Sequence, residues 1–244
     1  MNGKVESVSS PKRLARIAGV FYLLVGITGG FAEGFVDPKI YVAGNATATA
    51  GNVLANVGLV RMSVVSHLVD AVFFVLTAMA LYMLLEHVHK SMARAMLVFV
   101  AVAVGIITIN AVFQFEGLQV AINASYVTAF GAAGSNALVL LLLDIQHYGT
   151  LAAQVFFGLW LAPLGYLAYK SGLFPKVLGV TLIAAAVCYL VHLITAFLVP
   201  GFHEQIQPFI VIVPTIAEIW MVLYLLVVGV KTVNPNKRIL AATA

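Results

Sequence analysis

Charged residues are scarce in this sequence: they make up 9% of its 244 residues, whereas 62% are hydrophobic. Soluble domains carry about 25% charged residues, so the composition excludes an ordinary soluble fold and indicates a membrane protein. Cysteine is almost absent as well, since Cys188 is the single cysteine and lies in an apolar run. A disulfide framework and a cysteine-based metal motif are therefore excluded. Phosphate-binding loops, dinucleotide-binding motifs and nucleophile elbows are missing too.

Long apolar runs account for most of the chain. A hydrocarbon core of about 30 Å is crossed by about 20 residues of apolar helix, and six runs reach this length. The sequence predicts an all-α fold, a polytopic membrane helix bundle with six transmembrane helices and short outer-side helical segments, in a single integral membrane domain over residues 1–244. The predicted spans are about 14–36, 61–86, 92–115, 148–169, 176–199 and 207–230, and the predicted outer segments are 37–60 and 116–147.

The distribution of Lys and Arg decides between six spans and seven, because residues 127–145 form a rival apolar run. With six spans and the N-terminus inside, all of the 13 Lys and Arg residues except Lys39 and Arg61 lie on the cytoplasmic side. This distribution follows the positive-inside rule, and a seventh span would move Lys170 and every later cation outside. We therefore predict cytoplasmic N- and C-termini and a multi-pass protein of the bacterial inner (plasma) membrane. The net charge of +4 is explained by this topology, so no nucleic-acid partner is predicted.

The stretch SHLVD, residues 66–70, places an imidazole and a carboxylate inside the second predicted span. Ionisable residues at such a depth are costly, and they mark a functional site by default. Asp70 is expected about 13 Å from the outer surface at 1.5 Å per residue. His67 shares its face of the helix, whereas Arg61 falls on the opposite face. A buried carboxylate must be protonated, paired or bound to a metal, and the basic groups at this depth are histidines.

The other predicted spans also carry polar groups in their outer halves, whereas the inner halves hold almost nothing comparable. Polar groups at one depth on every helix can satisfy each other by facing a shared interior. The sequence therefore predicts a polar cavity in the outer half of the bundle. A histidine, His67 or His192, is expected beside Asp70 or Glu218. The candidate lining residues are His67, Asp70, His147, His192, Glu218, Asn110, Gln114, Gln154, Arg61 and Glu33.

Plainer interpretations stay open for several of these residues. Asn110, Gln114 and Gln154 can act as hydrogen-bonding links between helices, each contributing about 0.6 kcal/mol. A histidine at a helix end, such as His147, is often an interfacial residue rather than a catalytic one. A buried acid such as Glu218 is harder to explain as packing, because an isolated charge in the membrane is costly.

Several motifs resemble those of a known family. They are LVRMSVVSHLVD at 59–70, HYG at 147–149, FFG at 156–158, and KSG at 170–172. From residue 14 to 231 the sequence resembles the bacterial family catalogued as domain of unknown function 4386 (DUF4386). The resemblance implies a polytopic membrane protein without an agreed activity, and it adds weight to His147, Asp70, Arg61 and Glu218. Members of that family often carry an acidic residue at the position of His192 and a basic residue in the third span, where this chain is apolar. These departures weaken the carry-over of a proton or ion relay from the family.

The favoured class of function is binding or transport of a small or amphipathic ligand, including a lipid, by a protein in the bilayer. No cofactor is predicted for this class, and enzymatic activity and oligomeric state are left open. A non-catalytic accessory or assembly subunit is one alternative, since polar groups also hold helix bundles together.

A metal-dependent intramembrane hydrolase is the other alternative. Zinc sites of such enzymes use two or three His, Asp or Glu ligands and a water. Ser63 and His67 have a Ser-x-x-x-His spacing similar to that of ceramidase-type hydrolases. Haem held between His67 and His147 or His192 is a further hypothesis. The zinc ligands of this alternative are His67, Asp70, His147 and Glu218.

Overall fold

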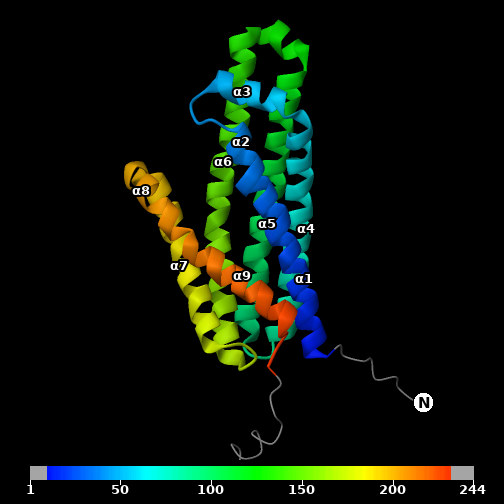
Figure 1. The fold of residues 1–244 in the computed structure, drawn as a ribbon, viewed down its shortest axis with the longest axis vertical. Helices are drawn as coiled ribbons and strands as arrows, with labels where there is room; N and C mark the ends of the chain where they lie inside the picture. The colour runs from blue at the N-terminus through cyan, green and yellow to red at the C-terminus, as the bar shows by residue number, and fades with distance from the viewer. Residues whose placement is uncertain (1–9, 232–244) are drawn as a thin grey trace, which may run out of the picture. The chain divides into compact units, whose positions relative to one another are not determined.

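A computed structural model describes residues 10–231 of the chain (Figure 1). Helices make up nearly all of this part, and no strand occurs within it. Six helical stretches are long and apolar enough to cross a membrane, which confirms the predicted all-α bundle with six transmembrane helices. The elements are α1 (Pro11–Gly29), η1 (Gly30–Val36), α2 (Asp37–Ile40), α3 (Ala46–Ala55), α4 (Val57–Leu85), α5 (Lys90–Ile122), α6 (Ala124–Ser171), α7 (Lys176–Leu198), α8 (Pro200–Ile210) and α9 (Ile212–Val227).

The first span consists of three consecutive helical elements, α1, η1 and α2. α1 begins directly after Ser10, whose hydroxyl accepts a hydrogen bond from a backbone N–H of the first turn. It passes into η1, a π-helical turn in which the N–H of Asp37 donates to the carbonyl of Ala32, five residues back. α2 ends where Tyr41 adopts an extended backbone. Helical structure therefore continues to Ile40, beyond the predicted end of this span at residue 36.

The connection to the second span contains the short helix α3. Asn45 caps this helix, since its side-chain oxygen accepts a hydrogen bond of 2.9 Å from the N–H of Ala48. The hydroxyl of Thr49 bonds both backbone groups of Val42 and so ties α3 to the preceding loop. These contacts confirm the prediction of a short helical segment outside the spans.

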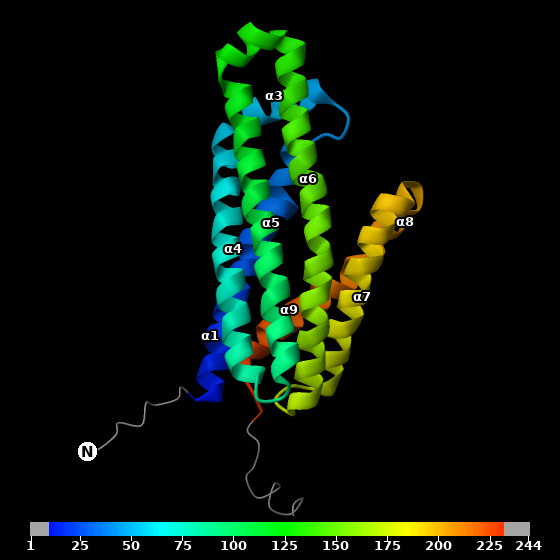
Figure 2. The ribbon, with the colours of Figure 1, turned by 180° about the vertical axis from the view of Figure 1, so that it is seen from behind.

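The helices α5 and α6 are longer than the spans predicted for them. Most of the predicted outer segment 116–147 belongs to these two helices, because α5 reaches Ile122 and α6 starts at Ala124. This stretch is rich in alanine, a strong helix former, which explains why its small and polar residues remain helical. The one non-helical backbone inside α6 is at Gly131 (φ 72°, ψ 167°). Figure 2 shows α5 and α6 side by side, joined by a turn.

The last two spans are formed by α7, α8 and α9. Pro175 precedes α7 and Pro200 opens α8, which are positions that proline favours at helix starts. The sixth predicted span, 207–230, is divided, since α8 ends at Ile210 and α9 begins at Ile212. Figure 1 shows α7 in yellow running beside α9 in orange, and the two helices are in extensive contact.

The helices form two compact units. Unit 1 comprises the chain up to Phe21, residues Leu76–Leu97 and the chain from Gly158 onwards. In unit 1, α6 and α7 meet backbone to backbone, because a Cβ added at Gly165 would lie 2.7 Å from the carbonyl oxygen of Gly179. Glycine at both positions is therefore what permits this close packing.

Unit 2 comprises Tyr22–Val75 and Val98–Phe157. It has an apolar core in which Val36 and Ile40 pack with Leu118 of α5 and Leu143 of α6. It also holds most of the buried polar side chains of residues 10–231. These are Thr49, Ser63, His67, Asp70, Asn110, Gln114, Ser135 and Gln146, whereas the buried polar residues of unit 1 are Thr77, His192 and Thr195.

Candidate functional site

Unit 2 brings three carboxyl groups together from two segments of the chain. Glu33 lies in η1, Asp37 at the start of α2 and Asp70 in α4. The charges of Asp37 and Asp70 both act on Glu33, so the three carboxyl groups interact electrostatically. His67 lies one turn before Asp70 on α4. We call Glu33, Asp37, Asp70 and His67 the carboxyl cluster.

The π-helical turn η1 positions two of these carboxyls. A π-helical turn holds more residues than an α-helical turn and therefore changes the direction in which the following side chains point. In η1 the N–H of Asp37 closes the turn on Ala32, and the next residue, Pro38, has no N–H that needs an acceptor. Such turns are frequent at functional sites, which supports a functional role for Glu33 and Asp37.

Each carboxylate oxygen of Asp37 accepts a hydrogen bond from a glutamine. Nε2 of Gln114, on α5, donates to Oδ1 at 2.8 Å, and Nε2 of Gln146, on α6, donates to Oδ2 at 2.7 Å. Both distances are typical of bonds to a charged acceptor. Three helices of unit 2 are therefore joined at one carboxyl group, which fixes the position of Asp37.

The imidazole of His67 faces Asp37. Its Nε2 lies 4.0 Å from Oδ2 of Asp37, and the His67 side chain is 4% exposed. This Nε2 is buried without a hydrogen-bond partner, and so is Oε1 of Gln114. Buried polar atoms in this state are uncommon in folded proteins. These two atoms beside Asp37 can therefore form a hydrogen bond with a further group, such as the O–H of a protonated carboxyl.

Asp70 contacts the first span. Its Oδ1 accepts a hydrogen bond of 3.3 Å from the hydroxyl of Thr28, and it would lie 3.3 Å from a Cβ added at Gly29. α1 and α4 approach closely at this level because Gly29 has no side chain. Asp70 itself is 7% exposed, so its carboxyl group is buried between these two helices.

Positive charge in unit 2 lies at the surface. Lys39 and Arg61 are the Lys and Arg residues of this unit, and both are exposed. Nζ of Lys39 lies 5.8 Å above the ring of Phe35, as in a cation–π contact. Arg61, a predicted lining residue, is thus placed among the exposed residues. Asp70 is buried, and Glu33 and Asp37 are half-buried.

A second cluster of polar side chains in unit 2 lies around His147. The hydroxyl of Tyr41 donates a hydrogen bond of 2.6 Å to Asp144, and the Tyr41 ring stacks on the exposed His147 with ring centroids 4.9 Å apart. Burial raises the pKa of the Tyr41 phenol, and the hydrogen bond to Asp144 raises it further. The phenol therefore stays protonated and remains the donor in this bond.

Asn110 and Gln154 lie on α5 and α6. Nδ2 of Asn110 donates to the hydroxyl of Thr150 at 3.3 Å and so links the two helices. Gly149 makes room for this contact, since a Cβ there would overlap the Asn110 amide. Gln154 is half-buried. For Asn110, a hydrogen-bonding link between helices matches the plainer of the two interpretations.

The candidates His192 and Glu218 belong to unit 1, where each has contacts of its own. The hydroxyl of Tyr189 on α7 donates to Oε1 of Glu218 on α9 at 2.8 Å. The rings of His192 and His203 lie with their centroids 4.6 Å apart, which brings α7 against α8. The predicted convergence of His192 and Glu218 with His67 on one site stays a prediction.

Asp37 and Gln146 were not among the residues that the sequence singled out. Asp37 fell just beyond the predicted end of the first span at residue 36 and so into a predicted outer segment. The residue before a proline, here Pro38, also usually leaves the helix. The available signal was the group of glycines at 29, 30 and 34, which suits an unusual helical turn. No signal pointed to Gln146. The acid opposite His67 is therefore Asp37, whereas the sequence favoured Asp70 or Glu218.

Comparison with known proteins identifies a family for this chain. The model of the family described as Domain of unknown function (DUF4386) matches residues 17–229. This chain belongs to the DUF4386 family. An uncharacterized protein of Archaeoglobus fulgidus is similar to this DUF4386 member, with 27% identity over 177 residues that cover 70% of this chain and 92% of the relative. No solved structure matches.

The zinc hypothesis has a direct test. Within residues 10–231 no group of three or more His, Cys, Asp or Glu is arranged to hold a metal ion, and at Asp37 both oxygens face N–H donors. We expect the same trace of zinc in detergent-purified wild type and in Asp70→Asn, measured by elemental mass spectrometry. One zinc per chain in the wild type, lost in the variant, would contradict this and favour the hydrolase.

Proposed function

We propose that this membrane protein binds and transports a small or amphipathic cation in exchange for protons, at the carboxyl cluster of unit 2. The observation that carries the proposal is the grouping of Glu33, Asp37 and Asp70 beside His67. Ionisable residues that face the interior of a helix bundle are typical of ion and substrate pathways.

Repulsion between the carboxylates explains why such a cluster needs a bound proton or cation. Two unit charges 4 Å apart interact by about 4 kcal/mol at an effective dielectric constant of 20. Three neighbouring carboxylates therefore repel each other strongly unless protons or a cation neutralise them. Since Lys39 and Arg61 are exposed, neutralisation is left to a proton or a ligand. The two occupants compete for the same charge, and this competition couples cation binding to proton release.

The hydrogen bonds suggest separate roles within the carboxyl cluster. The 4.0 Å between Oδ2 of Asp37 and Nε2 of His67 is too long for direct proton transfer. A proton passes between them when the side chains close to hydrogen-bond distance or through one bridging water. When Asp37 is protonated, rotation of the Gln114 amide would present its unsatisfied Oε1 as an acceptor. Asp70 and Glu33 then supply the negative charge that attracts the cation.

The test measures cation binding and proton release together. Tetraphenylphosphonium serves as the amphipathic cation, and its binding to purified protein is followed by calorimetry in two buffers of different protonation enthalpy. We expect release of about one proton for each cation bound by the wild type. Asp70→Asn should weaken binding, whereas Glu116→Gln, an exposed acid on α5 of the same unit, should bind like the wild type.

Three outcomes would contradict the proposal. Binding of tetraphenylphosphonium without proton release would rule out proton exchange. Equal binding by wild type, Asp70→Asn and Glu116→Gln would place the cation outside the carboxyl cluster. If the wild type bound no cation at all, the non-catalytic accessory subunit would become the better hypothesis.

We further infer that the membrane is the plasma membrane and that both termini are cytoplasmic, which the Lys and Arg distribution supports. Single cysteines in a Cys188→Ser background test this orientation in intact cells. Ala133→Cys, in the exposed first part of α6, should react with a membrane-impermeant maleimide. Ser91→Cys, exposed at the start of α5, should react only after the membrane is permeabilised. The reverse labelling pattern would show that both termini lie on the outer side of the membrane.

A further inference from the structure

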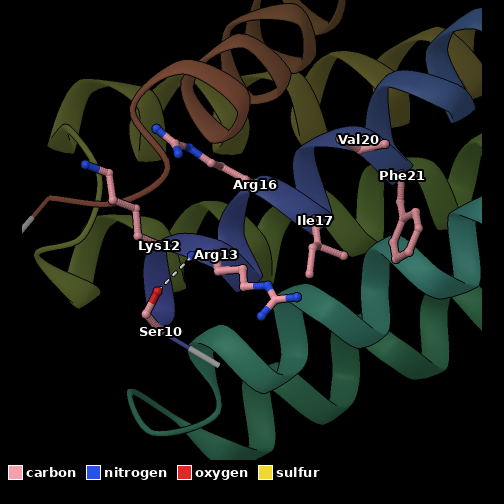
Figure 3. Close-up of a pocket in the computed structure, with 7 residues that line it drawn as sticks. All are labelled: Ser10, Lys12, Arg13, Arg16, Ile17, Val20 and Phe21. Atoms are coloured by element: carbon pink, nitrogen blue, oxygen red, sulfur yellow. Dashed lines mark hydrogen bonds between the residues drawn. The ribbon is translucent and has the colours of Figure 1, made fainter. Parts of the chain in front are cut away.

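A groove follows the first turns of α1 in unit 1 (Figure 3). Its volume is about 520 Å³, and its lining changes from polar to apolar along the helix. The polar end carries three cations, and the apolar end carries two aliphatic side chains and one aromatic ring. The lining residues are Ser10, Lys12, Arg13, Arg16, Ile17, Val20 and Phe21.

The groove occupies the face of α1 that does not pack on the protein. At 100° per residue, Arg13, Ile17 and Val20 share one side of the helix, and the buried Ala15 and Ala18 lie on the other. On the buried side, α1 packs tightly on α9, since a Cβ at Gly19 would lie 2.9 Å from Cβ of Leu225. The exposed side is thus left for a partner from the surrounding bilayer.

The three cations are not neutralised within the described part of unit 1. No ion pair of Lys12, Arg13 or Arg16 with a carboxylate occurs among residues 10–231, and all three side chains are exposed. The stem of Lys12 lies against Gly229, where a Cβ would be 3.0 Å from Cγ of Lys12. This contact holds the stem in place at the polar end of the groove.

The depth of the cations in the membrane matches that of lipid headgroups. The first span begins at Pro11, so Arg13 and Arg16 lie within about 8 Å of its start at 1.5 Å per residue. Ile17 and Val20 continue the groove into the apolar part of the span, where they would meet acyl chains. Basic pockets at this level of membrane proteins bind anionic headgroups.

We propose that this groove binds an anionic phospholipid, with its phosphate at the end that carries Arg13 and Arg16 and one acyl chain along Ile17 and Val20. Figure 3 shows the two guanidinium groups on opposite sides of α1, so these exposed side chains turn toward the phosphate when it binds. Guanidinium groups suit this role, because each can form two parallel hydrogen bonds to a phosphate. A free phosphate ion would use the polar end of the groove only. The apolar end distinguishes a lipid from a soluble anion, since it adds burial of hydrocarbon to the charge contacts.

Native mass spectrometry of the delipidated full-length chain tests the proposal. The probes are dioleoyl-phosphatidylglycerol and dioleoyl-phosphatidylcholine, which share their acyl chains. We expect the wild type to bind the anionic lipid about tenfold more tightly than the neutral one, and Arg13→Gln/Arg16→Gln to lose this preference. The matched control is Lys90→Gln/Arg94→Gln, which removes the same charge from exposed positions on α5 of unit 1 and should keep the preference.

A second comparison separates a lipid site from a phosphate site. Val20 is 47% exposed, so Val20→Asn should fold normally, and we expect it to weaken binding of phosphatidylglycerol several-fold. Millimolar inorganic phosphate should leave lipid binding unchanged. Displacement of the lipid by inorganic phosphate, with no effect of Val20→Asn, would show a soluble-anion site instead. Unchanged lipid preference in the Arg13→Gln/Arg16→Gln variant would overturn the proposal altogether.

Discussion

Asparagine in place of Asp37 is expected to abolish proton-coupled cation uptake while leaving the protein folded. The substitution removes the charge that His67 faces at 4.0 Å but keeps the size of the side chain. Its new amide N–H would point at one of the glutamine donors, Gln114 or Gln146. Rotation of the Gln114 amide resolves this conflict, because its Oε1 is buried without a partner. The melting temperature should therefore stay close to that of the wild type.

Asp37→Asn also removes one carboxyl charge that the bound cation would face. Loss of one partner from a close pair of opposite charges costs about 2–5 kcal/mol, which corresponds to roughly thirtyfold or more in cation affinity. Proteoliposomes that contain a pH-sensitive dye and an imposed tetraphenylphosphonium gradient measure the effect as a rate of internal pH change. Wild type and Glu116→Gln should give equal rates, and Asp37→Asn should give the rate of empty liposomes. A folded Asp37→Asn variant with the wild-type rate would remove Asp37 from the mechanism.

Alanine in place of Gly165 is expected to destabilise unit 1 more than any exposed glycine substitution. A Cβ at this position would lie 2.7 Å from the carbonyl oxygen of Gly179 and 2.8 Å from the side chain of Ile183. The carbonyl belongs to a helical backbone that cannot move alone, so α6 and α7 would have to separate. Overpacking of this kind costs about 1–3 kcal/mol, more than the roughly 1 kcal/mol that alanine contributes over glycine in a helix.

The matched control is Gly105→Ala in α5, where an added Cβ would have no atom within 4 Å. There the helix propensity of alanine acts alone, and the melting temperature in detergent should rise slightly. For Gly165→Ala we expect a decrease of about 2–4 °C, because the net cost after the gain in helix propensity is about 1 kcal/mol and chains of this size shift by about 2–4 °C per kcal/mol. Equal melting temperatures for both variants would show that α6 and α7 can separate at little cost.

The six spans follow from the sequence because hydropathy and length act over about 20 residues and tolerate local errors. The ends of the helices do not follow in the same way. Residues 116–147 contain glycine, serine and asparagine, which are typical of loops, and yet nearly all of them extend α5 and α6. Packing of Leu118, Val139 and Leu143 in the core of unit 2 outweighs these local preferences, and such tertiary contacts are not visible in a single sequence.

The candidate site, too, could be predicted from the sequence only in part. Periodicity placed His67 and Asp70 on one face of α4, and both are buried in unit 2. Gln114 was also selected, although as a possible link between helices, and its bond goes to an acid. The acid itself, Asp37, was not selected, because a span was expected to end before Asp37-Pro38. A hydrogen bond over five residues instead of four decides this point, and in the sequence the group of glycines at 29, 30 and 34 is the signal for it.

The winding of η1 also has a consequence for comparing this chain with its relatives. Each residue advances a helix by about 100°, so loss of a single residue between Gly30 and Val36 would turn Asp37 away from Gln114 and Gln146. Such a chain would keep all six spans and nearly all of its sequence identity, and it would still lack the site. Within the family, the length of this short segment is therefore a better marker of a shared carboxyl cluster than overall similarity.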